Sequence, residues 1–308
     1  LFPYTTLFRS CEFILGMDNF MTPSTEYCDI ILPGVTQFEV NDIITRSMGH
    51  AVAYYGQKIV EPMYECKSVN EVGYALAERL GVLDQFDDGK SDEDYLKEFV
   101  KISQNNHPDF PSYEEFKEKG IYKTEATKVI AYEKFVQDPQ ANPLPTPTGL
   151  IEVFSKDLYD IQHPEIPAIP KYMPVGEGPQ APLKDTYPLQ CIGHHTKRRV
   201  HSTFDNSSWM EEAEPQMLWM NPQDATARGI SDGDLVKIYN ERGTVKVKAK
   251  VTPRLIPGVC SLPQGAWYTP DQNGVDVRGN INTLTTWTPT PLAKGNPQHT
   301  NLVEIEKA

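Results

Sequence analysis

The sequence predicts an α/β segment followed by a β-barrel. Two apolar runs near the start, EFILG (12–16) and YCDIILP (27–33), are separated by a polar loop from Met17 to Glu26. Such short runs are typical of buried parallel strands, and ligands bind in loops at the carboxyl edge of a parallel sheet. Beyond residue 185, short strands, one small helix and many turns favour a closed barrel.

The α/β segment also carries helix signals. Ser68 opens a capping box (SVNE), apolar side chains recur at helical spacing over 69–80, and Gly81 stands at the C-cap position. Ser91 opens a second predicted helix, and residues 112–118 form a short third one. We therefore expect the segment to contain at least three helices.

The barrel segment shows strict alternation. TVKVKAKV (244–251) places valine and alanine on one face and lysine on the other, which predicts a half-buried strand paired with 235–239 in a hairpin. Before it, Asn221 is the N-cap of a short helix, with Pro222 in its first turn and Gly229 just past its end.

Prolines mark a connector between the two segments. Residues 139–188 hold 11 of the 26 prolines, which remove backbone donors and break helices. Within this stretch, LIEVF (150–154) is predicted as a single strand. The predicted organisation is an α/β part at 11–138, a connector at 139–184 and a barrel domain at 185–308.

The first ten residues, LFPYTTLFRS (1–10), resemble the translation of a sequencing-library adapter. We interpret them as an artefact and exclude them from the fold prediction. The alternative is an ordinary apolar strand. On either interpretation, we expect the chain to be a fragment whose true beginning is missing.

Charge separates the two segments. Residues 1–184 carry 29 acidic and 16 basic side chains, whereas residues 185–308 carry 13 of each, so the net charge of −13 belongs to the first part. This balance argues against a nucleic-acid partner, which needs a basic face. The acidic stretch 84–98 fits a solvated helical surface better than a metal site. The five cysteines include no CxxC pair, so the sequence predicts neither a disulfide framework nor a metal site.

Three polar segments are candidates for chemistry. GHHTKRRVHS (193–202) follows an apolar run and is rich in the arginine, hydroxyl and backbone donors that bind phosphate. RGNINTLT (278–285) and GNPQHTN (295–301) offer amides and hydroxyls that suit the edges of purines or pterins. A solvated surface loop is the alternative for each segment, and neighbouring His194 and His195 are poorly placed to share a metal ion.

Longer stretches carry a resemblance to a known family. They are DNFMTPSTEYCDIILPGVTQFEVND, HHTKRRVHSTFDN, WMNPQDATARGISDGDLVKIYNERGTV, LPQGAWYTPD and PLAKGNPQHTNLVEIEK. In this order they resemble the dimethyl sulfoxide reductase family of molybdopterin oxidoreductases. RVHSTFDN and PLAKGNPQHTNLVE point to the subgroup of catalytic A subunits of anaerobic dimethyl sulfoxide reductase.

The resemblance implies a four-domain enzyme that holds molybdenum on two molybdopterin guanine dinucleotides. The chain would be the C-terminal part of its α/β domain and a final double-psi β-barrel. Carried over position by position, the residues expected to contact the cofactor are Met17, Asp18, Gly193, His194, His195, Thr196, Arg199, His201, Ser202, Asn282, Gln298 and His299.

Departures from the family pattern limit this inference. Val40 and Val69 replace an arginine and an aspartate that contact the cofactor in some relatives. The family's molybdenum ligand and 4Fe–4S cysteines precede the segment present here. We therefore assign no catalytic residue and no metal ligand, and expect the chain alone to be inactive.

The family also suggests what the whole enzyme does. It implies reduction of an S-oxide or N-oxide by oxygen-atom transfer, with an iron–sulfur electron-transfer subunit, a membrane-anchor subunit and export in many relatives. One alternative is another reaction of the superfamily, such as that of a dehydroxylase or a formate, nitrate or polysulfide enzyme. The other is a non-catalytic barrel module that binds a nucleotide.

Overall fold

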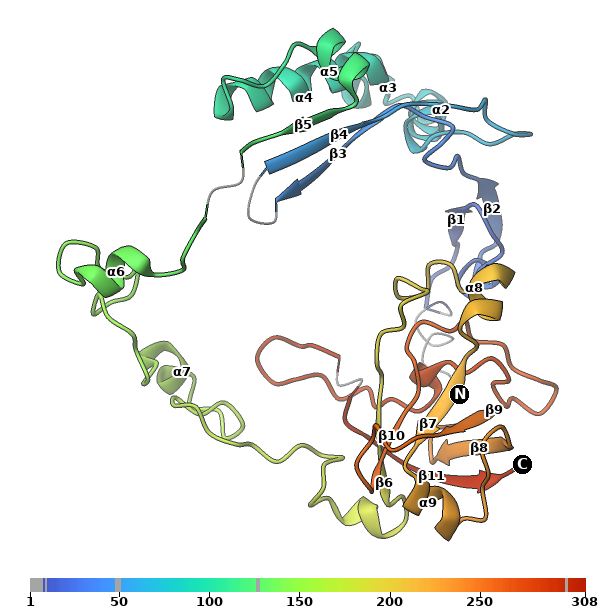
Figure 1. The fold of residues 1–308 in the computed structure, drawn as a ribbon. Coiled ribbons are helices and arrows are strands. Elements are labelled where there is room, and N and C mark those ends of the chain that lie inside the picture. Colours follow the sequence, from blue (N-terminus) through green and yellow to red (C-terminus); the bar gives the residue numbers. More distant parts are fainter. Residues whose placement is uncertain (1–7, 9, 48–50, 126–127, 297–298) are drawn as a thin grey trace. The chain divides into compact units, whose positions relative to one another are not determined.

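The computed structural model describes residues 8, 10–47, 51–125, 128–296 and 299–308. The chain divides into two compact units, traced from blue to red in Figure 1. One comprises Glu12–Pro145; the other comprises Thr146–Ala308 and the described residues up to Cys11. Nearly all of the predicted artefact at 1–10 lies outside the described residues, and the predicted domain limits stay predictions. No helix in the described ranges is long and apolar enough to cross a membrane.

The first unit begins with a parallel strand pair. β1 (Leu15–Asp18) pairs with β2 (Ile30–Pro33), and the 3-10 helix η1 (Thr25–Tyr27) lies between them in sequence. The parallel pairing is as predicted, but β1 starts later than expected and contains Met17 and Asp18, which were predicted in a loop. Ile30 and Ile31 are largely exposed rather than buried, because the described sheet has two strands only.

A second sheet in this unit was not predicted. β3 (Asp42–Ser47), β4 (Ala51–Gly56) and β5 (Ile121–Lys123) form an antiparallel sheet in the order β3-β4-β5. β5 is only three residues long and lies about 65 residues after β4 in sequence. Such a distant, short strand leaves little local signal.

The helices of this unit follow their capping signals. They are α2 (Val69–Leu80), α3 (Leu83–Phe86), α4 (Asp92–Asn106), α5 (Tyr113–Lys119) and α6 (Glu133–Gln137). Ser68, Ser91 and Ser112 each form a capping box, and Gly81 ends α2 with a left-handed φ of 70°. The three predicted helices are therefore confirmed to within a residue at their starts.

Helices α4 and α5 cover one face of the β3-β4-β5 sheet, as Figure 1 shows. Aromatic side chains build the small core between them: Phe116 is fully buried, and the Tyr55 and Tyr113 hydroxyls lie 3.2 Å apart. Phe110 and Tyr122 pack with ring centroids 4.3 Å apart. The Phe110 and Tyr122 rings are tilted by 44°, whereas Tyr55 meets Phe116 edge to face, and edge-to-face aromatic pairs stabilise a core beyond the area that they bury.

The second unit starts with little regular structure. The proline-rich stretch holds α7 (Lys156–Ile161) and the 3-10 helix η2 (Pro182–Asp185). The strand predicted at 150–154 is wrong. Ile151 and Val153 are exposed, and the chain instead reaches Ser155, whose hydroxyl caps α7.

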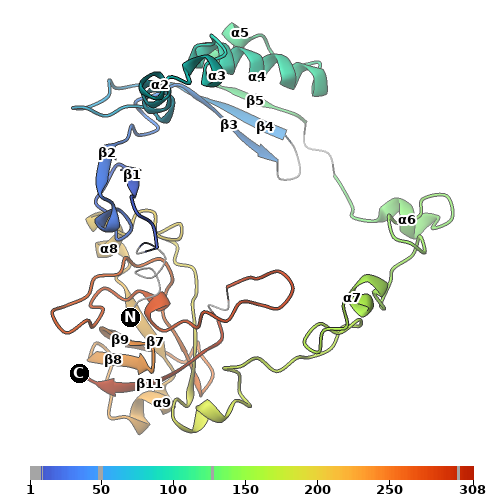
Figure 2. The same cartoon turned by 180° about the vertical axis from the view of Figure 1, so that it is seen from behind.

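A closed six-stranded barrel forms the body of the second unit. Its strands are β6 (Leu189–Ile192), β7 (Met217–Met220), β8 (Leu235–Asn240), β9 (Gly243–Val251), β10 (Val259–Ser261) and β11 (Asn301–Lys307). The order around the barrel is β10-β6-β11-β8-β9-β7. Figure 2 shows the barrel strands β7, β8, β9 and β11 from behind. The pairs β6–β10 and β7–β9 are parallel, and the other neighbours are antiparallel. An up-and-down barrel has antiparallel neighbours only, so this mixed pairing fits the expected double-psi type.

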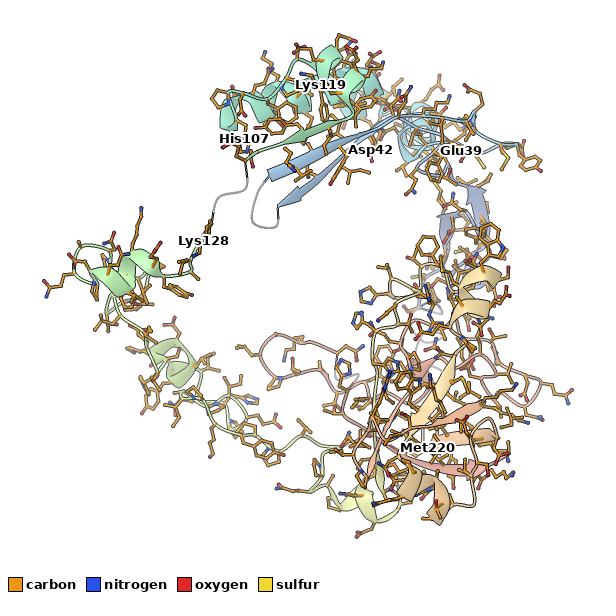
Figure 3. All side chains as sticks on the ribbon, in the orientation of Figure 1. Glu39, Asp42, His107, Lys119, Lys128 and Met220 are labelled. Atoms are coloured by element: carbon orange, nitrogen blue, oxygen red, sulfur yellow. The ribbon has the colours of Figure 1, made fainter. Side chains whose placement is uncertain are left out.

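The predicted β8–β9 hairpin accounts for much of the barrel core. Val245 and Ala249 of β9 are fully buried, whereas Lys248 and Lys250 are exposed, as the alternation predicts. Met220, labelled in Figure 3, is also fully buried. The remaining elements are α8 (Ser208–Ala213), the 3-10 helix η3 (Ile281–Thr283) and α9 (Pro222–Ala227), which Asn221 caps as predicted.

The substitution Leu218→Ala tests the assignment of the barrel core. The leucine side chain is fully buried, so Leu218→Ala should lower the free energy of unfolding by about 3 kcal/mol through lost burial and the cavity left behind. All four tryptophans lie beyond residue 185, so tryptophan fluorescence during urea unfolding reports on this unit. The control is Leu292→Ala, at an exposed leucine of the same unit. Equal effects of the two substitutions would contradict the assigned core.

Candidate functional site

Parallel pairing brings two loops to one edge of the barrel. β6 and β10 run side by side with Cys191 opposite Cys260, so the chain leaves both strands at the same edge. The two exits stay hydrogen bonded beyond the strands. Leu262 N–H donates to the carbonyl of Ile192 at 3.0 Å, and Gln264 N–H donates to that of His194 at 3.0 Å. The start of the candidate loop 193–202 is therefore held by backbone hydrogen bonds from residues 262–264.

The C-terminal candidate segment reaches the same place. Gly193 N–H donates to His299 Nδ1 at 3.2 Å. The contact follows from the pairing of β6 with β11, in which Cys191 lies opposite Asn301. Two predicted segments, 106 residues apart at this contact, thus meet at one strand end.

The two neighbouring histidines point to different partners. The His194 ring lies 2.6 Å from the Ser261 hydroxyl and 5.0 Å, centroid to centroid, from Trp219. Burial lowers the His194 pKa, with a smaller contribution from the nearby Arg199 charge, and Glu214 opposes the shift. His195 instead faces Gln264, and its Nε2 lies 2.7 Å from the glutamine Nε2.

Arg199 is directed into the protein. Its side chain is 7% exposed and pairs with Asp205, which is fully buried. Its guanidinium also donates to Gln216 Oε1 at 2.5 Å and to the Gln264 carbonyl at 3.4 Å. The Thr196 hydroxyl accepts the backbone N–H of Arg199 at 3.1 Å. The structure therefore gives Arg199 internal partners where the sequence predicted a phosphate.

Asp205 is the centre of this network. Besides Arg199 it accepts from Arg278 Nε at 2.6 Å and from the backbone N–H of Trp267 at 2.9 Å. The Trp267 indole N–H in turn donates to the Ser202 carbonyl at 2.9 Å. The end of the candidate loop is thus tied to two distant segments of the barrel unit.

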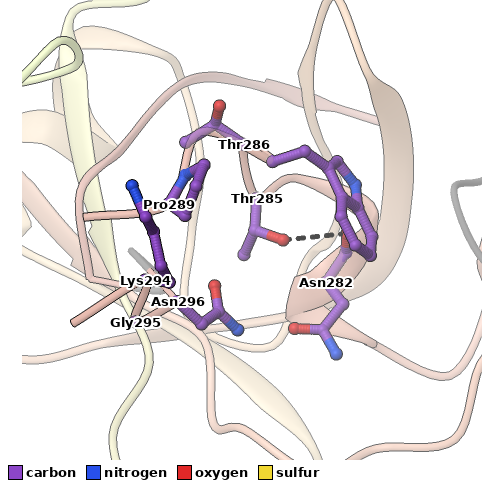
Figure 4. Close-up of a pocket in the computed structure, with 8 residues that line it drawn as sticks. Asn282, Thr285, Thr286, Pro289, Lys294, Gly295 and Asn296 are labelled. Atoms are coloured by element: carbon purple, nitrogen blue, oxygen red, sulfur yellow. Dashed lines mark hydrogen bonds between the residues drawn. The ribbon is translucent and has the colours of Figure 1, made fainter. Parts of the chain in front are cut away.

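A pocket of about 210 Å³ lies beside Asn282. Ligand sites for drug-sized molecules are about 300–1,000 Å³, so this pocket suits one ring system rather than a whole dinucleotide. Figure 4 shows seven of its lining residues with labels, among them the Asn282 and Asn296 amides and the Lys294 amine. The Thr285 hydroxyl donates to the Asn282 carbonyl at 3.2 Å and orients this part of the wall.

Three predicted site residues are not placed among these loops and the pocket of the second unit. Met17 and Asp18 lie at the end of β1 in the other unit, where Asp18 Oδ1 accepts the Asn19 N–H at 2.7 Å. Gln298 lies outside the described residues. The roles of all the predicted site residues stay predictions.

Four residues that shape the site were not predicted individually. They are Asp205, Gln216, Gln264 and Arg278, of which Arg278 opens the candidate segment 278–285. Asp205 and Gln264 stand within stretches that carry the family resemblance, which was the available signal. Gln216 and its contacts had no sequence signal, since its amide donates to the Pro263 and Gly279 carbonyls on remote segments.

Arg199→Ala tests the internal role of this arginine. Removing one partner of a buried ion pair costs about 3–5 kcal/mol, and we expect a loss near 3 because Asp205 keeps Arg278. Urea unfolding followed by tryptophan fluorescence measures the loss. The neighbouring Arg198, half exposed and 4.0 Å from Glu214, provides the control Arg198→Ala, with an expected change below ~0.5 kcal/mol. Similar values for the two variants would rule out the internal role.

The lowered pKa of His194 predicts that the stability of the fold depends on pH. The folded-state pKa of His194 lies below the ordinary value of 6.5, so the unfolded chain binds the proton first as the pH falls. The neutral, buried His194 therefore contributes to the free energy of unfolding. That contribution is fully present above about pH 6.5 and is lost as the pH falls through the folded-state pKa. His194→Gln should flatten the slope of unfolding free energy against pH between 7.5 and 5.5. His163→Gln, at an exposed histidine, should keep it. An unchanged slope in His194→Gln would refute the assignment.

Comparisons with known proteins bear on both units. Residues 189–302 match the family model described as "Molydopterin dinucleotide binding domain", and residues 4–79 match "Molybdopterin oxidoreductase". The chain is 45% identical to the dimethyl sulfoxide reductase DmsA of Escherichia coli K12, over 97% of this chain and 38% of the relative. It is 34% identical to the dimethyl sulfoxide/trimethylamine N-oxide reductase of Cereibacter sphaeroides, over 96% of this chain and 38% of the relative.

A solved structure shares the fold. Acetylene hydratase from Pelobacter acetylenicus matches 98% of this chain and 41% of its own, with a TM-score of 0.72 and 19% identity. The chain spans about 38% of the length of the two curated relatives described above. The resemblance stated from the sequence motifs is thereby confirmed. Family models cover the barrel with its candidate loops and the start of the first unit, so the chain belongs to the dimethyl sulfoxide reductase family of molybdopterin oxidoreductases.

Proposed function

We propose that the loops at this barrel edge bind a molybdopterin guanine dinucleotide. The observation that carries the proposal is the meeting of two remote segments, since Gly193 donates to His299 at the end of β6. The segment that contains Asn282 adds a pocket of about 210 Å³ within the same unit. The matched dinucleotide-binding model spans all three places.

The donors present fit such a cofactor. The pocket offers amides and hydroxyls for the edges of a heteroaromatic ring, and Lys294 offers a positive charge for a phosphate. Trp287 adds an aromatic surface to the pocket wall. Because the Arg199 guanidinium is occupied by Asp205 and Gln216, we assign Arg199 to holding the loop rather than to the pyrophosphate.

We further propose that the chain belongs to an enzyme that reduces an S-oxide or N-oxide. The support comes from relatives described as dimethyl sulfoxide and trimethylamine-N-oxide reductases. When bound, molybdenum on two pterin dinucleotides supplies the redox centre for oxygen-atom transfer, and this chain supplies binding and orientation. An iron–sulfur subunit, a membrane anchor and a 4Fe–4S cluster elsewhere in the enzyme are part of the same proposal.

A titration tests the binding proposal. The ligand is the metal-free, oxidised molybdopterin guanine dinucleotide, whose pterin is fluorescent, and the protein is the full chain. Asn282→Ala and Lys294→Ala should each weaken binding about tenfold, the equivalent of ~1.4 kcal/mol, a typical size for a lost hydrogen bond to a polar or charged ligand group. Lys171→Ala, at an exposed lysine outside the pocket, should leave the affinity unchanged.

Flavin adenine dinucleotide serves as the competing ligand in the same titration. A barrel that carries any dinucleotide would bind both ligands equally, which would overturn the assignment to a pterin cofactor. Wild-type protein that binds neither ligand would overturn the proposed function as a whole.

A further inference from the structure

Gln264 belongs to LPQGAWYTPD (262–271), a stretch to which the sequence assigned no chemistry. It follows β10 at the barrel edge where β6 gives way to the candidate loop. Its side chain is almost fully buried, at 6% exposure. A buried amide requires hydrogen-bond partners, and those of Gln264 lie in the candidate loop.

The amide of Gln264 lies between two imidazoles. Its Nε2 is 2.7 Å from His195 Nε2 and 3.2 Å from His201 Nδ1. The two rings lie edge to face, with centroids 5.1 Å apart and an angle of 71° between their planes. One side chain thus fixes the orientation of both rings.

The chemistry of an amide nitrogen determines the tautomers. A side-chain NH₂ carries two hydrogens and accepts none, so both imidazole nitrogens that face it must be acceptors. His195 then carries its proton on Nδ1, and His201 carries its proton on Nε2. Each ring is left with an N–H donor on the side away from Gln264.

The next residue fixes the backbone of the same loop. Gly265 has a φ of 97°, and a Cβ at this position would stand 1.8 Å from the His201 carbonyl oxygen. His201 itself has a left-handed φ of 53°. Only glycine allows this approach, so the Gln264–Gly265 dipeptide sets both the ring and the main chain of His201.

We propose that Gln264 is a positioning residue for cofactor binding. It selects opposite tautomers of His195 and His201 and so directs two imidazole N–H donors toward the acceptor oxygens or nitrogens of the pterin dinucleotide. This inference rests on the proposed function. Gln264 acts through the two histidines, which are the groups expected to touch the ligand.

Nitrogen-15 NMR of the imidazoles tests the tautomers without any ligand. The full chain is labelled at its seven histidines, and His195→Gln and His201→Gln identify the two signal sets. We expect a protonated Nδ1 for His195 and a protonated Nε2 for His201. In Gln264→Glu, a carboxylate that only accepts should draw the protons to the nitrogens that face it. Gln264→Met should remove the preference, and Gln190→Met, at a partly buried glutamine on β6, should keep the wild-type pattern.

Binding of the oxidised molybdopterin guanine dinucleotide provides the second readout. Gln264→Met and Gln264→Glu should each weaken binding about tenfold, and tryptophan fluorescence in urea shows whether the variants still fold. Protons on the nitrogens that face Gln264 in the wild type would overturn the inference whether or not the ligand binds. Expected tautomers together with unchanged affinity in both variants would also overturn it. A wild type that shows these tautomers but binds no dinucleotide would instead refute the proposed function on which the ligand role rests.

Discussion

The carboxylate of Asp205 joins the end of the candidate loop to Trp267 and Arg278, which lie 62 and 73 residues after it in the sequence. Fully buried, it accepts from Arg199, Arg278 and the backbone of Trp267. A carboxylate can be buried at tolerable cost only when its lone pairs are satisfied by such donors. The shape of the candidate loop depends on this interaction, because Arg199 lies within the loop and the other two partners lie outside it.

Strand direction explains why the site is located at this edge. Because β6 and β10 are parallel, the loops that follow them emerge together and remain hydrogen bonded through Leu262 and Gln264. Because β11 is antiparallel to β6, it begins at the edge where β6 ends, and His299, which precedes β11, lies beside Gly193. An all-antiparallel barrel would send the exits of β6 and its neighbours to opposite edges. The mixed pairing therefore concentrates polar loops at one edge.

Helix ends and the buried face of a strand could be predicted from the sequence, because they depend on neighbouring residues. Contacts between residues far apart in the chain could not. Ser68 and Gly81 determine the ends of α2 through interactions within a few residues, so their pattern was sufficient. The alternation of 244–251 likewise indicated its buried face. The internal partners of Arg199 could not be predicted, because two of its acceptors, Gln216 and the Gln264 carbonyl, lie 17 and 65 residues away and carry no local pattern. β5 was missed for the same reason, because it joins the β3–β4 hairpin across a long insertion of helices.

The close approach of Gly265 to His201 also constrains the order of folding. The loop 193–202 acquires its conformation from residues more than 60 positions later in the chain, so closing this contact costs chain entropy that local helices do not incur. Because β6 and β10 have to pair before the loops that follow them can meet, we expect barrel closure to precede completion of this edge. A ligand that recognises the completed edge would then select chains whose barrel has already folded.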